Sequence, residues 1–139
     1  MRLGFTVVEL MITLCIVAIL STIALPRVQG LLDSIHVRGA VVEIESTFGA
    51  ARHIAIARGA QTVVDIDTAR RIISVSVGEI ALRQREVGAV HDVTLGATRT
   101  RMSYAATGMG YGAANLSVVV RRNSAADTVF VSRLGRVRH

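Results

Sequence analysis

Residues 4–25 of the chain read GFTVVELMITLCIVAILSTIAL, and this stretch decides the fold. From Phe5 to Leu25 it holds 21 residues with a single charge, that of Glu9. As an α-helix these residues extend about 31 Å at about 1.5 Å per residue, which matches the roughly 30 Å apolar core of a lipid bilayer. The sequence therefore predicts a membrane-spanning helix over residues 5–25.

Glu9 is the one charged side chain of this apolar segment. An acidic residue costs roughly 2.5 to 3.5 kcal/mol at the centre of a membrane helix and less near its end. A carboxylate kept in such a helix points to a functional role, with a partner that has to be named. Because residues 5–25 contain no cation, we expect Glu9 to pair with a positive charge from outside its own helix.

The run Gly4-Phe5-Thr6-Val7-Val8-Glu9-Leu10, behind the short leader Met1-Arg2-Leu3, resembles the class III signal of type IV prepilins and pseudopilins. The resemblance implies that prepilin peptidase removes residues 1–4 and that Phe5 becomes the N-methylated first residue. It implies that Glu9 faces the terminal amine of a neighbouring pilin or pseudopilin subunit. It also implies a single-pass protein of the bacterial inner membrane with a periplasmic domain, assembled into a periplasmic or surface fibre.

Two other interpretations of the apolar segment stay open. An ordinary secretory signal peptide would use Thr22 and Ala24 as small residues before its cleavage site. Its apolar region, however, is typically about 7 to 15 residues long, which is shorter than this one. A plain membrane anchor accounts for the length of the segment and leaves Glu9 without a role.

Residues 26–59 are predicted to continue the helix as an amphipathic segment that begins at Pro26. Apolar residues recur there at spacings of three and four, which is one helical face: Val37, Val41, Ile44, Phe48, Ala51 and Ala55. Gly59 is expected to end the helix in a left-handed conformation. The apolar stripe needs a surface to cover, and the strands that follow would supply it.

Residues 60–139 are predicted to form an antiparallel β domain, because the apolar period changes from 3.6 to 2 after Gly59 and the turns are short. The expected strands are 62–67, 72–77, 80–85, 93–95, 101–105, 116–122 and 128–132, with a turn over 123–127 joining the last two. The fold class is therefore α+β and pilin-like, with a long N-terminal helix packed on antiparallel sheets.

No residue pattern indicates catalysis, and we expect a protein that is not an enzyme and holds no cofactor or metal. The glycine-rich stretch 107–112 precedes no helix, so it is interpreted as a turn and not as a phosphate loop. The four histidines show no metal-ligand spacing. Asp65 and Asp67 share one face of a strand, where solvation explains them better than a bound cation does.

All sixteen basic residues are arginines, and they are unevenly placed. Residues 5–67 carry four arginines against six acidic residues, a net charge of −2, whereas residues 68–139 carry eleven against four, a net charge of +7. This asymmetry indicates either a polyanionic partner or arginines that solvate the outer faces of strands.

The soluble part has a resemblance of its own. Ala50–Gly59, Tyr104–Gly108 and Val129–Arg138 resemble the helix end, the aromatic loop and the last strand of GspH/FimT-type minor pseudopilins. This resemblance implies a minor pseudopilin of a type II secretion pseudopilus or a related type IV pilus-like fibre, with secreted proteins as candidate partners. We place this structural role first.

The alternative is a FimT-like minor type IV pilin that binds DNA for uptake, since Gly135–Arg138 matches the Gly-Arg-x-Arg motif of such proteins. On a strand Arg136 and Arg138 would point to one side, as would Arg99 and Arg101. The arginines considered for DNA contact are Arg99, Arg101, Arg121, Arg122, Arg133, Arg136 and Arg138.

Overall fold

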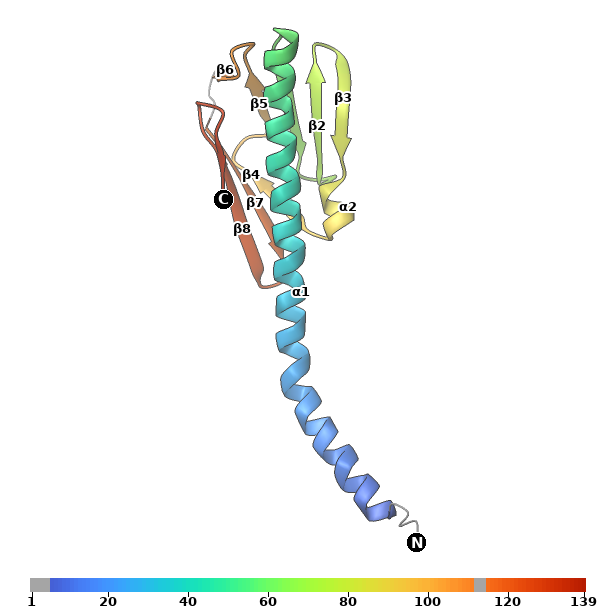
Figure 1. Ribbon diagram of the computed structural model, residues 1–139. Helices are drawn as coiled ribbons and strands as arrows, with labels where there is room; N and C mark the ends of the chain where they lie inside the picture. Colours follow the sequence, from blue (N-terminus) through green and yellow to red (C-terminus); the bar gives the residue numbers. More distant parts are fainter. Residues whose placement is uncertain (1–5, 112–114) are drawn as a thin grey trace. The chain divides into compact units, whose positions relative to one another are not determined.

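The computed structural model describes residues 6–111 and 115–139. The predicted processing residues Gly4 and Phe5 therefore lie outside the described residues, as does the end of the glycine-rich stretch. The chain divides into two compact units, Met1–Leu32 and Asp33–His139, which are described separately below. The helix α1 (Val7–Arg58) contains residues of both units, with Pro26 inside it (Figure 1).

In the first unit α1 is apolar and exposed almost throughout. It contains an 18-residue window of mean hydropathy 2.5, none of it buried, and by length and composition it is the one helix of the described residues suited to cross a membrane. Hydroxyl groups within it donate to carbonyl groups of the preceding turn, at 2.8 Å from Thr13 to Leu10 and at 2.7 Å from Thr22 to Ile19. Such bonds leave these hydroxyls satisfied without water.

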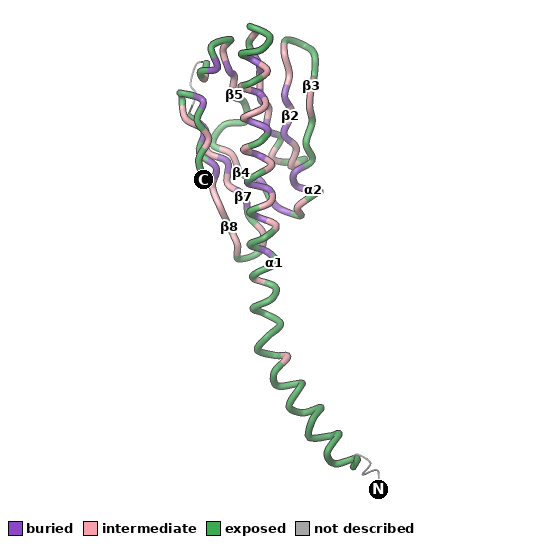
Figure 2. Tube along the Cα trace, in the orientation of Figure 1, coloured by how far each residue is buried: buried purple, intermediate pink, exposed green. Residues whose placement is uncertain are grey.

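In the second unit the predicted apolar stripe of α1 is confirmed. The buried residues of the helix begin at Asp33 and include all six residues of that stripe, and Figure 2 shows them on this part of the helix only. The helix ends at Arg58, as expected, with Gly59 at a φ of 58°. The Ala60 N–H donates to the Ala55 carbonyl at 3.2 Å, which closes the helix end.

The strands of the described residues form two antiparallel sheets (Figure 1). The elements after α1 are β1 (Thr62–Asp67), β2 (Ile72–Val77), β3 (Ile80–Arg85), α2 (Val87–His91), β4 (Thr94–Ala97), β5 (Arg101–Tyr104), β6 (Gly110–Tyr111), β7 (Leu116–Arg122), β8 (Ala125–Val131) and β9 (Val137–Arg138). One sheet has the order β3-β2-β1-β5-β6 and the other β4-β7-β8-β9. Both sheets contribute buried residues to one core with α1, among them Phe48, Val64 and Val118.

Several predicted boundaries are wrong by a few residues. The hairpin turn before β8 is shorter than expected, because Asn123 adopts a positive φ of 48° and lets the strand begin at Ala125. The predicted strand 93–95 is β4, shifted toward the C-terminus. The short elements α2 and β6 have no counterpart among the expectations, since two to five residues give no readable period. The strand β9 is shorter than the strand considered for Arg136 and Arg138, since it begins at Val137.

Candidate functional site

The helix α1 begins at a pair of residues that the prepilin-like motif contains. The Glu9 backbone N–H donates to the Thr6 side-chain oxygen at 3.3 Å, and the Leu10 N–H donates to the Thr6 carbonyl at 3.2 Å. Thr6 is thus the N-cap, and Glu9 stands three residues later, as in a capping box. The positive end of the helix dipole also favours a carboxylate in this first turn.

The Glu9 carboxylate is exposed and belongs to no ion pair of the described residues. Its backbone has a defined role in the helix start, whereas its charge has no partner within the described part of the chain. The expectation that Glu9 pairs with another molecule therefore stays a prediction. Thr6 received no role from the sequence, although the spacing Thr-x-x-Glu is a readable signal for a helix start.

A tight turn over Ser132–Arg136 presents the C-terminal arginines. The Ser132 N–H donates to the Arg136 carbonyl at 2.8 Å, and the Arg136 N–H donates to the Ser132 side-chain oxygen at 3.2 Å. Gly135 has a φ of 74°, a conformation that other residues rarely adopt. We call residues 132–136 the C-terminal turn.

The C-terminal turn packs against α1 and against the glycine-rich stretch that contains Gly108. A Cβ on Gly135 would lie 2.6 Å from the Gly108 carbonyl oxygen, so the two backbones are in close contact. That same oxygen accepts a hydrogen bond from Arg52 Nε at 3.0 Å. The Gly110 N–H donates to the Arg133 carbonyl at 3.0 Å. Arg52 and Gly108 thus position the turn, and the sequence carried no signal for this contact between distant segments.

The seven candidate arginines separate into two groups. Arg101 Nε donates to Asp65 at 2.6 Å, and this hydrogen bond raises the pKa of Arg101. Arg122 Nε donates to Asp33 at 2.9 Å. The side chains of the others are exposed and belong to no ion pair of the described residues: Arg99, Arg121, Arg133, Arg136 and Arg138.

Arg136 and Arg99 lie just outside the strands on which they were expected. Arg136 precedes β9, and Arg99 lies in the segment between β4 and β5. Strand alternation therefore does not orient Arg99 relative to Arg101. Arg136 and Arg138 nevertheless line the same hollow.

Arg122 belongs to a network that fastens the β7–β8 hairpin to α1. Asp33 is buried, and its carboxylate accepts hydrogen bonds from Arg122 and, at 3.0 Å, from the Asn123 amide. Arg122 also donates to the His91 carbonyl at 3.0 Å. The hydrogen bond from Asn123, followed by the bond and charge of Arg122, holds the pKa of Asp33 below its ordinary value, although burial opposes this shift.

A hollow of about 380 Å³ lies between α1 and the C-terminal turn. Arg136 and Arg138 line it on one side, with Arg52 and His53 of α1 on the other. At its edge His139 Nδ1 lies 2.9 Å from the Glu45 carboxylate, and that hydrogen bond raises the pKa of His139. The hollow is thus mainly cationic, with Glu45 already engaged.

The described residues contain no group of three or more His, Cys, Asp or Glu side chains placed to hold a metal ion. Asp65 pairs with Arg101, and the Asp67 carboxylate accepts a hydrogen bond from the Arg70 N–H at 2.8 Å. Cys15 is a free, exposed cysteine of α1. Burial raises the pKa of Tyr104 to about 12, so this phenol stays neutral at physiological pH.

No protein-family profile and no curated protein sequence matches the chain. Among solved structures, it is similar to the type IV minor pilin FimU of Pseudomonas aeruginosa in two crystal forms. The TM-scores are 0.65 and 0.62, each at 14% identity over 73% of this chain, covering 86% and 90% of the FimU chains. It is also similar to the minor pseudopilin EpsH from the type 2 secretion system of Vibrio cholerae, with a TM-score of 0.59 and 11% identity over 74% of this chain and 94% of EpsH.

These similarities, together with the long N-terminal helix and the antiparallel sheets, confirm the predicted α+β pilin-like fold of a minor pilin or pseudopilin. At 11 to 14% identity they concern the fold alone.

Proposed function

We propose that the chain is a structural subunit of a pilus-like fibre, as a minor pseudopilin of a type II secretion pseudopilus or of a related type IV pilus-like fibre. Residues 5–25 hold it in the bacterial inner membrane by a single span, with the domain 60–139 in the periplasm. Prepilin peptidase cleaves after Gly4, and Phe5 is methylated. Other pilin-like subunits are its partners in the fibre, and secreted proteins are its candidate cargo.

The observation that carries this proposal is the start of α1. The first part of α1 is apolar and exposed, begins with the Thr6 cap and bears in its first turn one carboxylate, Glu9, that forms no ion pair within the described residues. A carboxylate at this place suits a cation that a neighbouring subunit brings, because a charge pair inside a bundle of helices is strong in its low dielectric. The fold shared with a minor pilin and a minor pseudopilin supports the same interpretation.

Intact-mass spectrometry of the membrane-extracted chain tests the proposal. We expect the loss of residues 1–4 and the gain of one methyl group on Phe5, and Gly4→Val should leave the uncut precursor in the membrane. A matched Leu3→Val variant changes the leader without touching the cleavage residue and should be processed normally. A mature terminus after Ala24, or an unprocessed wild-type chain in cells that contain prepilin peptidase, would refute the proposal.

A second candidate function is DNA binding by the arginines of the C-terminal turn and β9. The observation that favours it is that Arg133 and Arg136 of the C-terminal turn and Arg138 of β9 are exposed and form no ion pair within the described residues. The turn itself is held against α1 through Arg52 and Gly108. Guanidinium groups bind phosphate through paired hydrogen bonds without reading the base sequence. The salt dependence of DNA binding by the full-length chain, compared with a chain that carries Arg136→Gln and Arg138→Gln, tests this candidate.

A further inference from the structure

The four-stranded sheet β4-β7-β8-β9 has an outer face that nothing in the described residues covers. Its inner face is buried through Leu95, Val118 and Val129. The register forms three rows across the strands, in which each residue pairs with the next: Thr94–Arg121–Ala126, Gly96–Val119–Thr128 and Ser117–Phe130–Arg138. These nine residues, which alternate with the buried ones, are called the outer face here.

The outer face is cationic and partly apolar. It carries two arginines, Arg121 and Arg138, and no acidic residue. Arg138 belongs to the edge strand β9 and also borders the hollow between the C-terminal turn and α1. Both arginines are exposed and belong to no ion pair of the described residues. Phe130 stands directly opposite Arg138 with 56% of its surface exposed. An exposed aromatic side chain beside unpaired guanidiniums is typical of the composition of protein interfaces.

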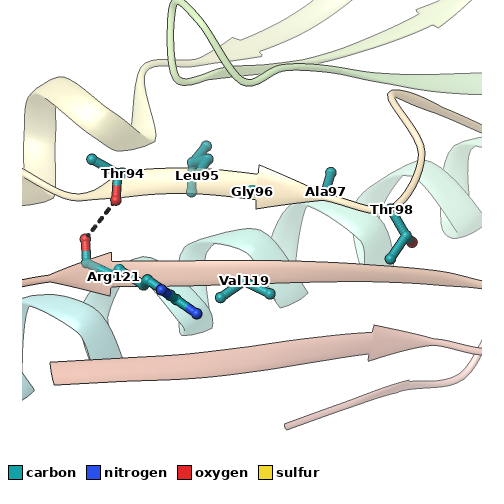
Figure 3. A pocket seen from close by; sticks show the side chains of 7 residues that line it. All are labelled: Thr94, Leu95, Gly96, Ala97, Thr98, Val119 and Arg121. Atoms are coloured by element: carbon teal, nitrogen blue, oxygen red, sulfur yellow. Dashed lines mark hydrogen bonds between the residues drawn. The ribbon is translucent and has the colours of Figure 1, made fainter.

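A hollow of about 470 Å³ lies on this face between β4 and β7 (Figure 3). Five consecutive residues at the edge strand β4 and two residues of β7 line it: Thr94, Leu95, Gly96, Ala97, Thr98, Val119 and Arg121. The Thr94 hydroxyl donates to the Arg121 carbonyl at 3.2 Å, as Figure 3 shows, and the Thr98 side-chain oxygen accepts from the Ser117 N–H at 3.0 Å. Because the sheet backbone engages both hydroxyls, the hollow offers aliphatic surface and the guanidinium of Arg121.

This combination suits an apolar side chain in the hollow next to a carboxylate on Arg121. Counting four residues along β7 and two strand spacings across the sheet, Arg121 and Arg138 lie roughly 17 Å apart. About five residues of extended peptide span that distance. A segment with acidic residues at both ends and apolar residues between them therefore matches the outer face.

The two other occupants of a cationic face fit less well. A polynucleotide gains affinity from many phosphate contacts, and two arginines this far apart supply few. A second copy of this chain would bring a C-terminal half that also carries a net charge of +7, so the two copies would repel each other. We infer that the outer face of the sheet β4-β7-β8-β9 binds an acidic, apolar-anchored segment of a different protein.

Fluorescence anisotropy with the full-length chain in detergent micelles tests this inference. The probe is a blocked, fluorescein-labelled peptide with Glu at both ends and Leu residues between them, and the matched peptides replace Glu by Gln or Leu by Ala. We expect the first probe to bind and each matched peptide to bind about tenfold more weakly, since both the charge and the anchor contribute. Equal binding of all three peptides would overturn the inference.

Two variants test whether the peptide binds at the hollow. A Cβ on Gly96 would lie 3.9 Å from Val119 Cβ, an ordinary contact, so Gly96→Val should fill the hollow without strain. We expect Gly96→Val and Arg121→Gln each to weaken binding about tenfold with an unchanged melting temperature. Arg70→Gln is the control, because Arg70 is an exposed arginine between β1 and β2 of the other sheet.

Three results would overturn the inference. Unchanged binding by Gly96→Val would show that the hollow is not used. Equal losses in Arg121→Gln and Arg70→Gln would reduce the effect to net charge. A labelled oligothymidylate that binds more tightly than the peptide and is lost in the same two variants would make the outer face a nucleic-acid surface. The processing of residues 1–4 is independent of all three, so a failure here leaves the proposed fibre role untouched.

Discussion

The backbone of Gly135 packs against the carbonyl of Gly108, and a Cβ on Gly135 would lie 2.6 Å from that oxygen. Gly135 also has a φ of 74°. Gly135→Ala should therefore force the C-terminal turn away from Gly108 and lower the free energy of unfolding by about 1 to 3 kcal/mol. Urea unfolding of the full-length chain, followed by circular dichroism of its β structure, measures this cost.

Gly49→Ala is the matched control for that substitution. Gly49 lies inside α1, and a Cβ added to it would have nothing within 4 Å. Alanine there should stabilise the helix by about 1 kcal/mol. If Gly135→Ala lowered the free energy of unfolding no more than Gly49→Ala does, the contact between Gly135 and Gly108 would not hold the C-terminal turn in place.

Substitutions at Glu9 and Thr6 test separately the carboxylate charge of Glu9 and the N-cap of α1. Glu9→Ala should insert into the membrane at least as well as the wild type, because it removes a desolvation cost, while its incorporation into the fibre falls. Thr6→Ala removes the N-cap, which costs about 1 kcal/mol, and keeps the carboxylate. Cross-linking to fibre partners measures incorporation.

If the charge of Glu9 matters, Thr6→Ala should keep most cross-links and Glu9→Gln should lose them. Equal losses in Thr6→Ala and Glu9→Gln would mean that Glu9 acts through the start of α1. Normal cross-linking of Glu9→Ala would leave the carboxylate without an assembly role.

The sequence predicted the elements whose pattern is long and local. The stripe from Val37 to Ala55 and the strands β1, β2 and β7 agree with the structure, because burial on one face imposes a period of 3.6 or 2 over six residues or more. The strand β3 also has its predicted bounds, although none of its residues is buried. The position of the C-terminal turn was not predictable, since it depends on contacts of the Gly108 carbonyl with the Arg52 side chain and with Gly135, which lie far apart in the sequence. Nor was the pairing of Arg122 with Asp33, which are 89 positions apart.

The network around Asp33 should make the domain sensitive to acid. Because the hydrogen bond from Asn123 and the charge of Arg122 lower the pKa of Asp33 in the folded chain, its contribution is present above its ordinary pKa of 3.8 and is lost as the pH falls through the lowered value. Arg122→Gln should lower the melting temperature at pH 7 more than Arg121→Gln, since Arg121 forms no ion pair within the described residues. A larger effect of Arg121→Gln would contradict the network.

The contact of His139 with Glu45 should weaken as the pH rises, whereas the contribution of Asp33 is lost as the pH falls. The hydrogen bond and charge of Glu45 raise the pKa of His139 in the folded chain. Its contribution is therefore fully present below the ordinary value of 6.5 and is lost as the pH rises through the raised pKa. An NMR titration of the His139 ring should show a higher pKa than in a Glu45→Gln variant, and equal values would show that the contact does not form in solution.

The last prediction decides whether the C-terminal arginines bind DNA. If they do, the full-length chain in micelles should bind duplexes of unrelated sequence equally, and affinity should fall steeply with salt, with a slope near −0.9 per neutralised phosphate. Arg136→Gln with Arg138→Gln should flatten that slope by about two and leave the melting temperature unchanged, because both side chains are exposed and unpaired within the described residues.

The matched control replaces Arg70 and Arg83, which lie on the five-stranded sheet and its turn, so it removes the same charge from another surface. If DNA binds at the C-terminal turn, the salt dependence of the affinity should flatten when Arg136 and Arg138 are replaced and stay unchanged when Arg70 and Arg83 are replaced. Equal flattening by both pairs would indicate attraction by net charge alone, which any chain with a net charge of +6 exerts. No binding by the wild type at low salt would leave the arginines as solvating side chains of a fibre subunit.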